Sequence, residues 1–277
     1  MAAVLLAILR LTWPLTWGIR WYWIHSRRKW GKRLLVDVVL KRMVPPPPEG
    51  FVADLPGGGK VFLHHREDIG LAYKLSGAFE PAELAFVREH AAPNTTAFDV
   101  GANIGIFTVP LALTVGSRGH VVAIEPEFEN ARRVIDNALL NELDNVQVRV
   151  AAAGERPGNA HLQEGRDPAF HAVDTEESPG SLVRIETLDE IWTRGGSPRV
   201  SLVKIDTEGG EQKVLRGSTR MLRACHPVLL VEAKERADVR WVDDFLSEFG
   251  YTRMATRGFA VGNHAYKVAA DAAVAAA

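Results

Sequence analysis

The chain has 277 residues, of which 47% are hydrophobic and 24% charged, and its formal net charge at pH 7 is −1. This composition favours one α/β domain with additions over several domains. The single cysteine, Cys225, excludes an internal disulfide and lies far from any Cys/His metal spacing, so no metal ligand set is predicted. We therefore expect a reducing, cytoplasmic setting.

The charge is unevenly distributed along the chain. The first 50 residues carry nine Lys/Arg and two Asp/Glu, a net charge of +7, and the remaining 24 basic and 32 acidic residues give −8. An acidic body disfavours binding to nucleic acid, because neutralising phosphates needs a basic surface. We therefore expect no nucleic-acid partner, and a local role for the basic end.

The N-terminal stretch contains five of the seven tryptophans. Arg10 and Arg20 interrupt it before it reaches the ~18 to 20 uncharged apolar residues of a membrane span. Trp13, Trp17 and Trp21 recur every four residues ahead of a basic cluster, which is typical of an amphipathic helix in an anionic membrane interface. Two interpretations stay open: residues 1–33 contact a membrane, peripherally and from the cytoplasmic side, or they form an aromatic helix that packs on the domain.

Composition shifts divide the chain into five predicted regions. "VPPPPEG" marks a stiff linker, and "VAADAAVAAA" is low-complexity sequence. The regions are a basic, Trp-rich extension (1–44), a Pro-rich linker (45–50), a cap (51–95), an α/β core (96–266) and an Ala-rich tail (267–277).

Short apolar runs alternate with helical patterns through the core. Helical periodicity is clearest over residues 129–140. Alternating strands and helices predict a mostly parallel sheet with helices on both faces. The predicted strands, which read as buried on both faces, cover residues 96–100, 120–126, 145–152, 201–206 and 227–233.

The stretch "AFDVGANIGIFTVPLA" joins the first core strand to a helix and combines an acid with glycines. In doubly wound sheets the ligand binds where such a bend follows the carboxyl end of a strand. Gly101 and Gly105, on either side of Asn103, let the backbone approach a ligand closely. A tight turn without a ligand is the alternative. Pro110 falls inside the following helix and predicts a kink.

Two acids indicate which ligand this bend would take. Asp99 precedes the first glycine, where an acid would repel a pyrophosphate and attract a cation. Glu125 ends the second predicted strand, 24 residues after Gly101, near the spacing of about 20 at which an acid accepts from ribose hydroxyls. The two acids predict a nucleoside with positive charge, for which S-adenosylmethionine is the obvious candidate.

A second group of acids follows the fourth predicted strand in "SLVKIDTEGGEQKVLRG". Acids favour the start of a helix, which explains Glu211. Asp206 follows apolar Val203 and Ile205 at the ligand-binding end of the strand, where a buried charge needs a reason. With Glu208 it forms a candidate catalytic group.

The chain resembles the FkbM-type methyltransferases in several blocks that together span about residues 77 to 235. "DVGANIG" and "KIDTEG", in that order, are the specific ones, accompanied by "GAFEPAELAFVREH", "VVAIEPEFENARRVIDNALLN" and "VRIETLDEI". The resemblance implies a class I, Rossmann-like methyltransferase that depends on S-adenosylmethionine. It also implies a hydroxyl acceptor on a small molecule, such as a sugar or polyketide-type product, or on a glycan.

The resemblance also implies roles for individual positions. Glu80 would close over the methionine end of the methyl donor, Glu125 would hold its ribose, and Ala152 with Ala153 would lie near its adenine. Asp206 and Glu208 would face the transferred methyl group. The loop around the donor would comprise Asp99, Gly101, Asn103 and Gly105.

Several alternatives stay open at this point. Asp206 or Glu208 is the predicted base for the acceptor hydroxyl, and histidines without a diagnostic spacing are alternatives, namely His64, His65, His161 and His171. Residues 154–182 are polar and rich in turn formers, which predicts a mobile lid. An NAD(P)-dependent oxidoreductase would show a three-glycine phosphate loop, and Asp99 counts against it. A membrane-anchored module without catalytic activity is the third interpretation.

Overall fold

The computed structural model describes residues 50–65, 67–163, 172–174 and 180–268. The predicted N-terminal extension, nearly all of the Pro-rich linker and most of the Ala-rich tail lie outside this part. The chain divides into a smaller unit, 1–53 with 62–79, and a larger unit, 54–61 with 80–277. Among the described residues, no helix combines the length and apolarity that crossing a membrane requires.

The smaller unit includes a helix that follows a short β-hairpin. The hairpin strands β1 (Phe51–Asp54) and β2 (Lys60–Leu63) form a two-stranded sheet, with the turn between them assigned to the larger unit. The helix α4 (Asp68–Ser76) buries Ile69 and Leu71 and ends at Gly77 in the left-handed region, with φ 79°.

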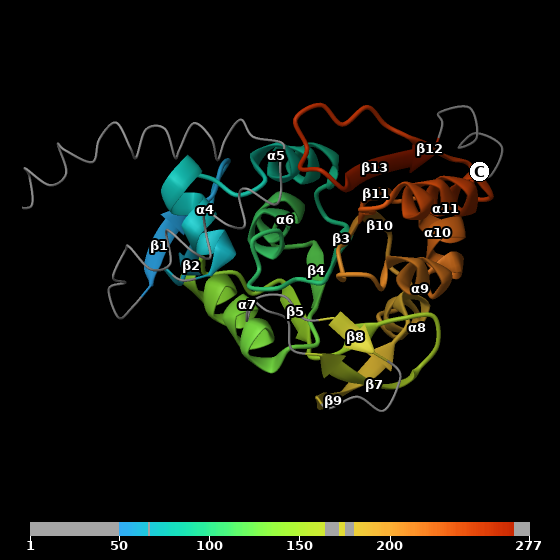
Figure 1. Ribbon diagram of the computed structural model, residues 1–277, viewed down its shortest axis with the longest axis horizontal. Helices are drawn as coiled ribbons and strands as arrows, with labels where there is room; N and C mark the ends of the chain where they lie inside the picture. The colour runs from blue at the N-terminus through green and yellow to red at the C-terminus, as the bar shows by residue number, and fades with distance from the viewer. Residues whose placement is uncertain (1–49, 66, 164–171, 175–179, 269–277) are drawn as a thin grey trace, which may run out of the picture. The chain divides into compact units, whose positions relative to one another are not determined.

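A seven-stranded sheet forms the centre of the larger unit (Figure 1). Its order is β12-β13-β11-β10-β3-β4-β5, in which β5, β4, β3, β10 and β11 run parallel and β13 is antiparallel to both of its neighbours. The strands are β3 (Thr96–Val100), β4 (His120–Ile124), β5 (Val146–Arg149), β10 (Val200–Ile205), β11 (Val228–Glu232), β12 (Tyr251–Arg253) and β13 (Asn263–Val268).

Helices cover both faces of this sheet, as the alternating pattern predicts. One face packs against α5 (Pro81–His90), α6 (Thr108–Val115) and α7 (Phe128–Leu140). Residues of the other four helices share a core with Phe98, Val203 and Leu229 on the opposite face. These helices are α8 (Leu188–Arg194), α9 (Glu211–Arg216), α10 (Thr219–Cys225) and α11 (Arg236–Ser247).

The strand order reverses between β3 and β10, which places the predicted ligand site. From β3 the chain adds β4 and β5 on one side and later β10 and β11 on the other. The carboxyl ends of β3 and β10 therefore lie side by side at the switch point, where such sheets bind ligands. Ile205, the last residue of β10, pairs with Val100, the last of β3.

The run over residues 145–152 is two strands, so the prediction of one buried strand was wrong. β5 ends at Arg149, and β6 (Ala152–Ala153) belongs to a second sheet of order β6-β9-β7-β8. β5 is an edge strand with an exposed Gln147, so the chain can turn away after it. A bidentate ion pair of 2.6 and 2.7 Å between Arg149 and Glu186 ties β5 to β9.

The described part of residues 154–182 forms strands of the second sheet, β7 (Gly158–Gln163), β8 (Ala172–Asp174) and the start of β9 (Ser181–Glu186), and the mobile lid stays a prediction. One further prediction needs correction. Pro110 lies in the first turn of α6, which begins at Thr108. Backbone N–H groups in a first turn have no intrahelical partner to lose, so Pro110 gives no reason for a kink.

Candidate active site

The glycine loop after β3 adopts the backbone that its sequence predicts. Gly101 and Gly105 have φ values of 75° and 90°, and Asn103 has φ 51°. A Cβ at Gly101 would overlap the carbonyl oxygen of Asp206. Glycine is therefore required where the ends of β3 and β10 touch.

Glu125, the first residue after β4, is anchored by the same loop. Its Oε2 accepts from the backbone N–H of Asn103 at 2.8 Å, and its Oε1 accepts from that of Glu127 at 3.0 Å. The residue is 6% exposed, and burial raises its pKa to about 7 although both backbone donors favour the charged form. A fixed carboxylate with unused lone pairs suits the hydroxyls of a ribose.

Asp99, in β3, has two partners within the protein. It is fully buried, accepts from the Thr108 hydroxyl at 2.6 Å and lies 3.5 Å from the ammonium of Lys204. Burial raises the pKa of Asp99, while Lys204 and Thr108 lower it. Its charge thus has partners within the protein, and the attraction of a ligand cation by Asp99 stays a prediction.

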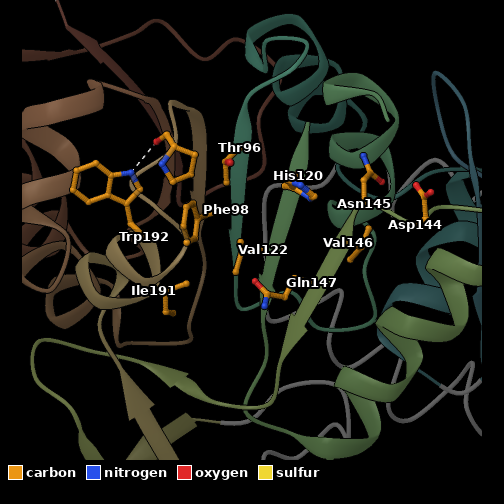
Figure 2. Close-up of a pocket in the computed structure, with 12 residues that line it drawn as sticks. Thr96, Phe98, His120, Val122, Asp144, Asn145, Val146, Gln147, Ile191 and Trp192 are labelled. Carbon is orange, nitrogen blue, oxygen red and sulfur yellow. Dashed lines mark hydrogen bonds between the residues drawn. The ribbon is translucent and has the colours of Figure 1, made fainter. Parts of the chain in front are cut away.

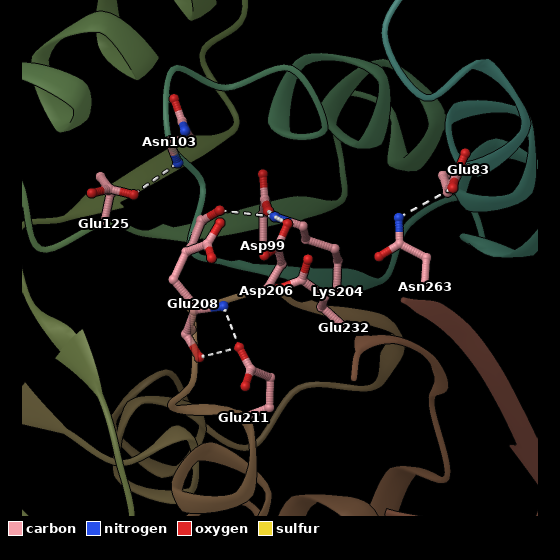
Figure 3. A network of polar contacts seen from close by, with 12 residues as sticks. Glu83, Asp99, Asn103, Glu125, Lys204, Asp206, Glu208, Glu211, Glu232 and Asn263 are labelled. Carbon is pink, nitrogen blue, oxygen red and sulfur yellow. Dashed lines mark hydrogen bonds and ion pairs between the residues drawn. The ribbon is translucent and has the colours of Figure 1, made fainter. Parts of the chain in front are cut away.

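Lys204 is the central residue that the sequence analysis missed (Figure 3). Its ammonium donates to the Gly101 carbonyl at 2.8 Å and lies 3.5 Å from carboxylate oxygens of both Asp99 and Asp206. Burial would lower the pKa of Lys204, but Asp206 and Asp99 outweigh burial and hold it above its usual value. A lysine between Val203 and Ile205 in an apolar strand was the available signal.

The acids after β10 differ in their surroundings. The Asp206 side chain is 29% exposed, so it is not the buried charge that was expected. Glu208 has φ 54° and accepts from Lys234 at 2.6 Å. Glu211 accepts from the N–H and hydroxyl of Thr207 and from the N–H of Gly209, which confirms that it acts at the start of α9.

β11 adds a further acid that was not predicted. Glu232, its last residue, lies 2.9 Å from the ammonium of Lys234. Burial and the nearby carboxylate of Asp206 raise the pKa of Glu232 to about 8. Because the ends of adjacent parallel strands meet, an acid that ends "PVLLVE" was a usable signal. No comparable signal in the sequence indicated that Lys234 and Asn263 lie near these acids.

Glu80 and Ala152 take different places relative to this network. Glu80, with φ 43°, lies just before α5; burial and the charges of Glu83 and Asp206 raise its pKa to about 8. Asp206 and Glu80 are therefore within electrostatic range of each other. Ala152 is buried in β6 and pairs with Ile185 of β9, in the second sheet.

Neither histidine catalysis nor metal binding gains support here. His161 lies on β7 of the second sheet, and His171 lies outside the described residues. Carboxylate oxygens of Asp206, Glu211 and Glu232 approach within 4.8 Å of one another. However, Glu211 already accepts from three donors and Glu232 pairs with Lys234, so we assign no metal to them.

A pocket of about 450 Å³ lies away from these acids (Figure 2). Its lining includes the apolar Phe98, Val122 and Trp192 and the polar Thr96 and His120. Thr96 and His120 begin β3 and β4, whereas the glycine loop and Glu125 follow the other ends of these strands. The pocket is therefore separate from the predicted site.

The Methyltransferase FkbM domain matches residues 99–253, which is more than half of the chain and includes all the acids after β3, β4, β10 and β11. The chain belongs to the FkbM methyltransferase family. S-adenosylmethionine is the methyl donor of FkbM-type enzymes, and the fold is the class I arrangement that the resemblance implied. This assignment counts against the NAD(P)-dependent oxidoreductase.

Two individual proteins illustrate what the chain is similar to. Hexuronic acid methyltransferase AglP of Haloferax volcanii is 30% identical over 164 residues, which cover 58% of this chain and 64% of AglP. The matched part is thus less than two thirds of that relative. The crystal structure of the FkbM methyltransferase from Methylobacillus flagellatus KT is 20% identical, with a TM-score of 0.44, over 71% of this chain and 52% of that one.

The residues of the site fit S-adenosylmethionine. Ribose hydroxyls need acceptors, and Glu125 offers a carboxylate that the loop already orients. The sulfonium and ammonium groups need negative surroundings, which the Asp206 carboxylate supplies and to which Glu80 and Glu232 add charge when they ionise. A pyrophosphate would be repelled by the same set.

Proposed function

We propose that the chain transfers a methyl group from S-adenosylmethionine to a hydroxyl of a sugar or glycan, or of a polyketide-type product. The observation that carries this proposal is the contact between the donor loop and the acids after β10, where Gly101 touches the backbone of Asp206. The similarity to a hexuronic acid methyltransferase supports a sugar acceptor.

Binding of the donor is attributed to the elements around the glycine loop. S-adenosylmethionine supplies a methyl group made electrophilic by a positively charged sulfur. Glu125 accepts from the ribose, Glu80 lies toward the methionine end, and Ala152 lies toward the adenine. Asp99 contributes through the loop, since its carboxylate contacts Thr108 and Lys204. Positioning of the reacting atoms provides a large part of the rate.

The acceptor hydroxyl must lose its proton during the transfer, and a carboxylate is the proposed recipient. Asp206 is better placed for this role than Glu208. The Glu208 carboxylate is held by a direct 2.6 Å hydrogen bond from Lys234, whereas the Asp206 carboxylate lies 3.5 Å from the ammonium of Lys204.

Methyl-labelled S-adenosylmethionine and a panel of glycosides test the proposal. We would incubate the full chain with p-nitrophenyl glucuronide and p-nitrophenyl glucoside and locate the transferred methyl by NMR. The proposal predicts an ether at a ring hydroxyl and at least a hundredfold loss of kcat in Asp206→Asn. An exposed neighbour, Glu235→Gln, serves as the control. Near-normal turnover in both Asp206→Asn and Glu208→Gln would exclude a carboxylate base.

We also propose that residues 1–33 hold the enzyme peripherally at the cytoplasmic face of a membrane, where a lipid-linked glycan would be a reasonable acceptor. The tryptophans at four-residue spacing and the basic cluster support this proposal. Replacing Trp13, Trp17 and Trp21 with serine in the full chain should abolish sedimentation with vesicles containing anionic lipid. Unchanged sedimentation would contradict the proposal.

A further inference from the structure

Two carboxylates at the acceptor side lie on neighbouring parallel strands. Asp206 follows β10, Glu232 ends β11, and the last β10 residue, Ile205, pairs with Val231. Oxygens of the two side chains approach within 4.8 Å. At this separation the proton affinity of each carboxylate depends on the charge of the other.

The two lysines of the site do not balance these acids. Lys204 is shared between Asp99 and Asp206, and Lys234 between Glu208 and Glu232. Each ammonium therefore faces two carboxylates, which leaves excess negative charge at the ends of β10 and β11. The titratable and charged groups around the pair come from several elements: Lys204 on β10, Glu208 in the next turn, Glu211 on α9, Lys234 after β11, Glu80 before α5 and His264 on β13.

We propose that Asp206 and Glu232 act as one pair that accepts the proton of the acceptor hydroxyl. Binding of the cationic methyl donor prepares the pair by releasing the proton that the pair holds beforehand. This inference rests on the proposed function. A positive ligand beside the pair supplies the missing counter-charge and so favours the form in which both carboxylates are ionised. The structure already holds the pair close to that transition, since burial and Asp206 raise the pKa of Glu232 to about 8.

Charge and atoms balance over the transfer that follows. The bond between the acceptor oxygen and the methyl carbon forms as the bond between sulfur and that carbon breaks, and the electron pair of the broken bond stays on sulfur. The acceptor proton passes to the carboxylate pair. The site loses one positive charge at sulfur and gains one at the pair, so its net charge is unchanged. Asp206 touches the acceptor in this scheme, and Glu232 is a positioning residue that acts through it.

Proton release on ligand binding tests the pair without an acceptor. We would titrate the full chain calorimetrically at pH 7.5 in phosphate and in Tris, using S-adenosylmethionine and S-adenosylhomocysteine, whose sulfur is uncharged. The dependence of the heat on the buffer gives the number of protons released. The wild type should release roughly half a proton more with the charged ligand. Glu232→Gln should remove this difference while it keeps affinity within about fivefold, and Asp206→Asn should also remove it.

The controls separate this inference from the proposed function. Glu235→Gln removes an exposed acid of the same loop and should behave as the wild type. Equal proton release with the two ligands in the wild type, or an unchanged difference in Glu232→Gln and Asp206→Asn, would overturn the pair while leaving donor binding intact. A folded wild type that binds neither ligand would instead overturn the proposed function.

Discussion

The site contains two lysine-centred clusters that differ in burial. The buried cluster joins Lys204 to Asp99, Asp206 and the Gly101 carbonyl, and its lysine side chain is 6% exposed. The exposed cluster joins Lys234 to Glu208 and Glu232, and its lysine side chain is 40% exposed. Buried charges lose their partners only at great cost, whereas half-exposed ones exchange partners and protons easily. We infer that the first cluster fixes the loop and the second adjusts to the reaction.

Removing the buried lysine should have the largest effect. Lys204→Met leaves Asp99 without its counter-charge in the core and should lower the free energy of unfolding by about 3–5 kcal/mol. Urea denaturation measures this change. Lys213→Met, at an exposed position on α9, should change it by less than about 0.5 kcal/mol. Similar values for the two variants would show that the buried cluster does not stabilise the fold.

Disturbing the contact between β3 and β10 should have the second-largest effect on stability. Gly101→Ala combines a left-handed backbone with an overlap on Asp206 and should cost about 3 kcal/mol and abolish donor binding. Gly77→Ala is the control, because its φ of 79° is close to the 75° of Gly101, its backbone is left-handed, and nothing lies within 4 Å of the new Cβ. Backbone strain alone should cost it about 1 kcal/mol. Equal losses would mean that the strand contact is unimportant.

Stability should fall as pH rises, because the acids of the site bind protons more tightly in the folded state. Their pKa values are about 7 for Glu125 and about 8 for Glu80 and Glu232, against 4.5 normally. The stabilisation from protonation is complete below pH 4.5 and is lost between pH 4.5 and 8. From pH 5 to pH 7 the free energy of unfolding, measured by urea denaturation, should fall by roughly 2 kcal/mol more in the wild type than in Glu125→Gln. A wild type whose stability rises over this range would contradict the assignment.

The exposed lysine should matter least for stability. Lys234→Met should lower the free energy of unfolding by less than about 1 kcal/mol, because its ion pairs are open to water. It should nevertheless shift the pH profile of kcat, since Glu208 and Glu232 lose their cation. Lys234→Arg should restore the profile. A loss of stability as large as that of Lys204→Met would remove the distinction between the clusters.

The elements of the core were predictable because their signals are local. The run over residues 96–100 and the periodicity over 129–140 correspond to β3 and α7. The break between β5 and β6 was not predictable, because it depends on β5 being an edge strand and on the ion pair of Arg149 with Glu186. Neither strand order nor that pairing can be read from a run of apolar residues.

The residues of the candidate site likewise fall into those that the sequence predicts and those that it does not. Glycines at positive φ and Glu125 beside them follow from spacing along the chain. The ion pair of Asp99 with Lys204 joins residues that are far apart in the sequence, so spacing along the chain could not predict it. Sequence spacing identifies which side chains reach the site; packing decides which of them are already neutralised.

Binding of S-adenosylmethionine by the full chain tests the central claim most directly. Calorimetry at pH 8 should give a dissociation constant in the micromolar range, weakened at least tenfold in Glu125→Gln, which loses a charged acceptor for the ribose hydroxyls. Glu129→Gln, with a side chain 63% exposed on α7, should bind as the wild type does. Absence of binding by folded wild type, or equal affinity in Glu125→Gln, would contradict a methyl-donor site at the carboxyl ends of β3 and β4.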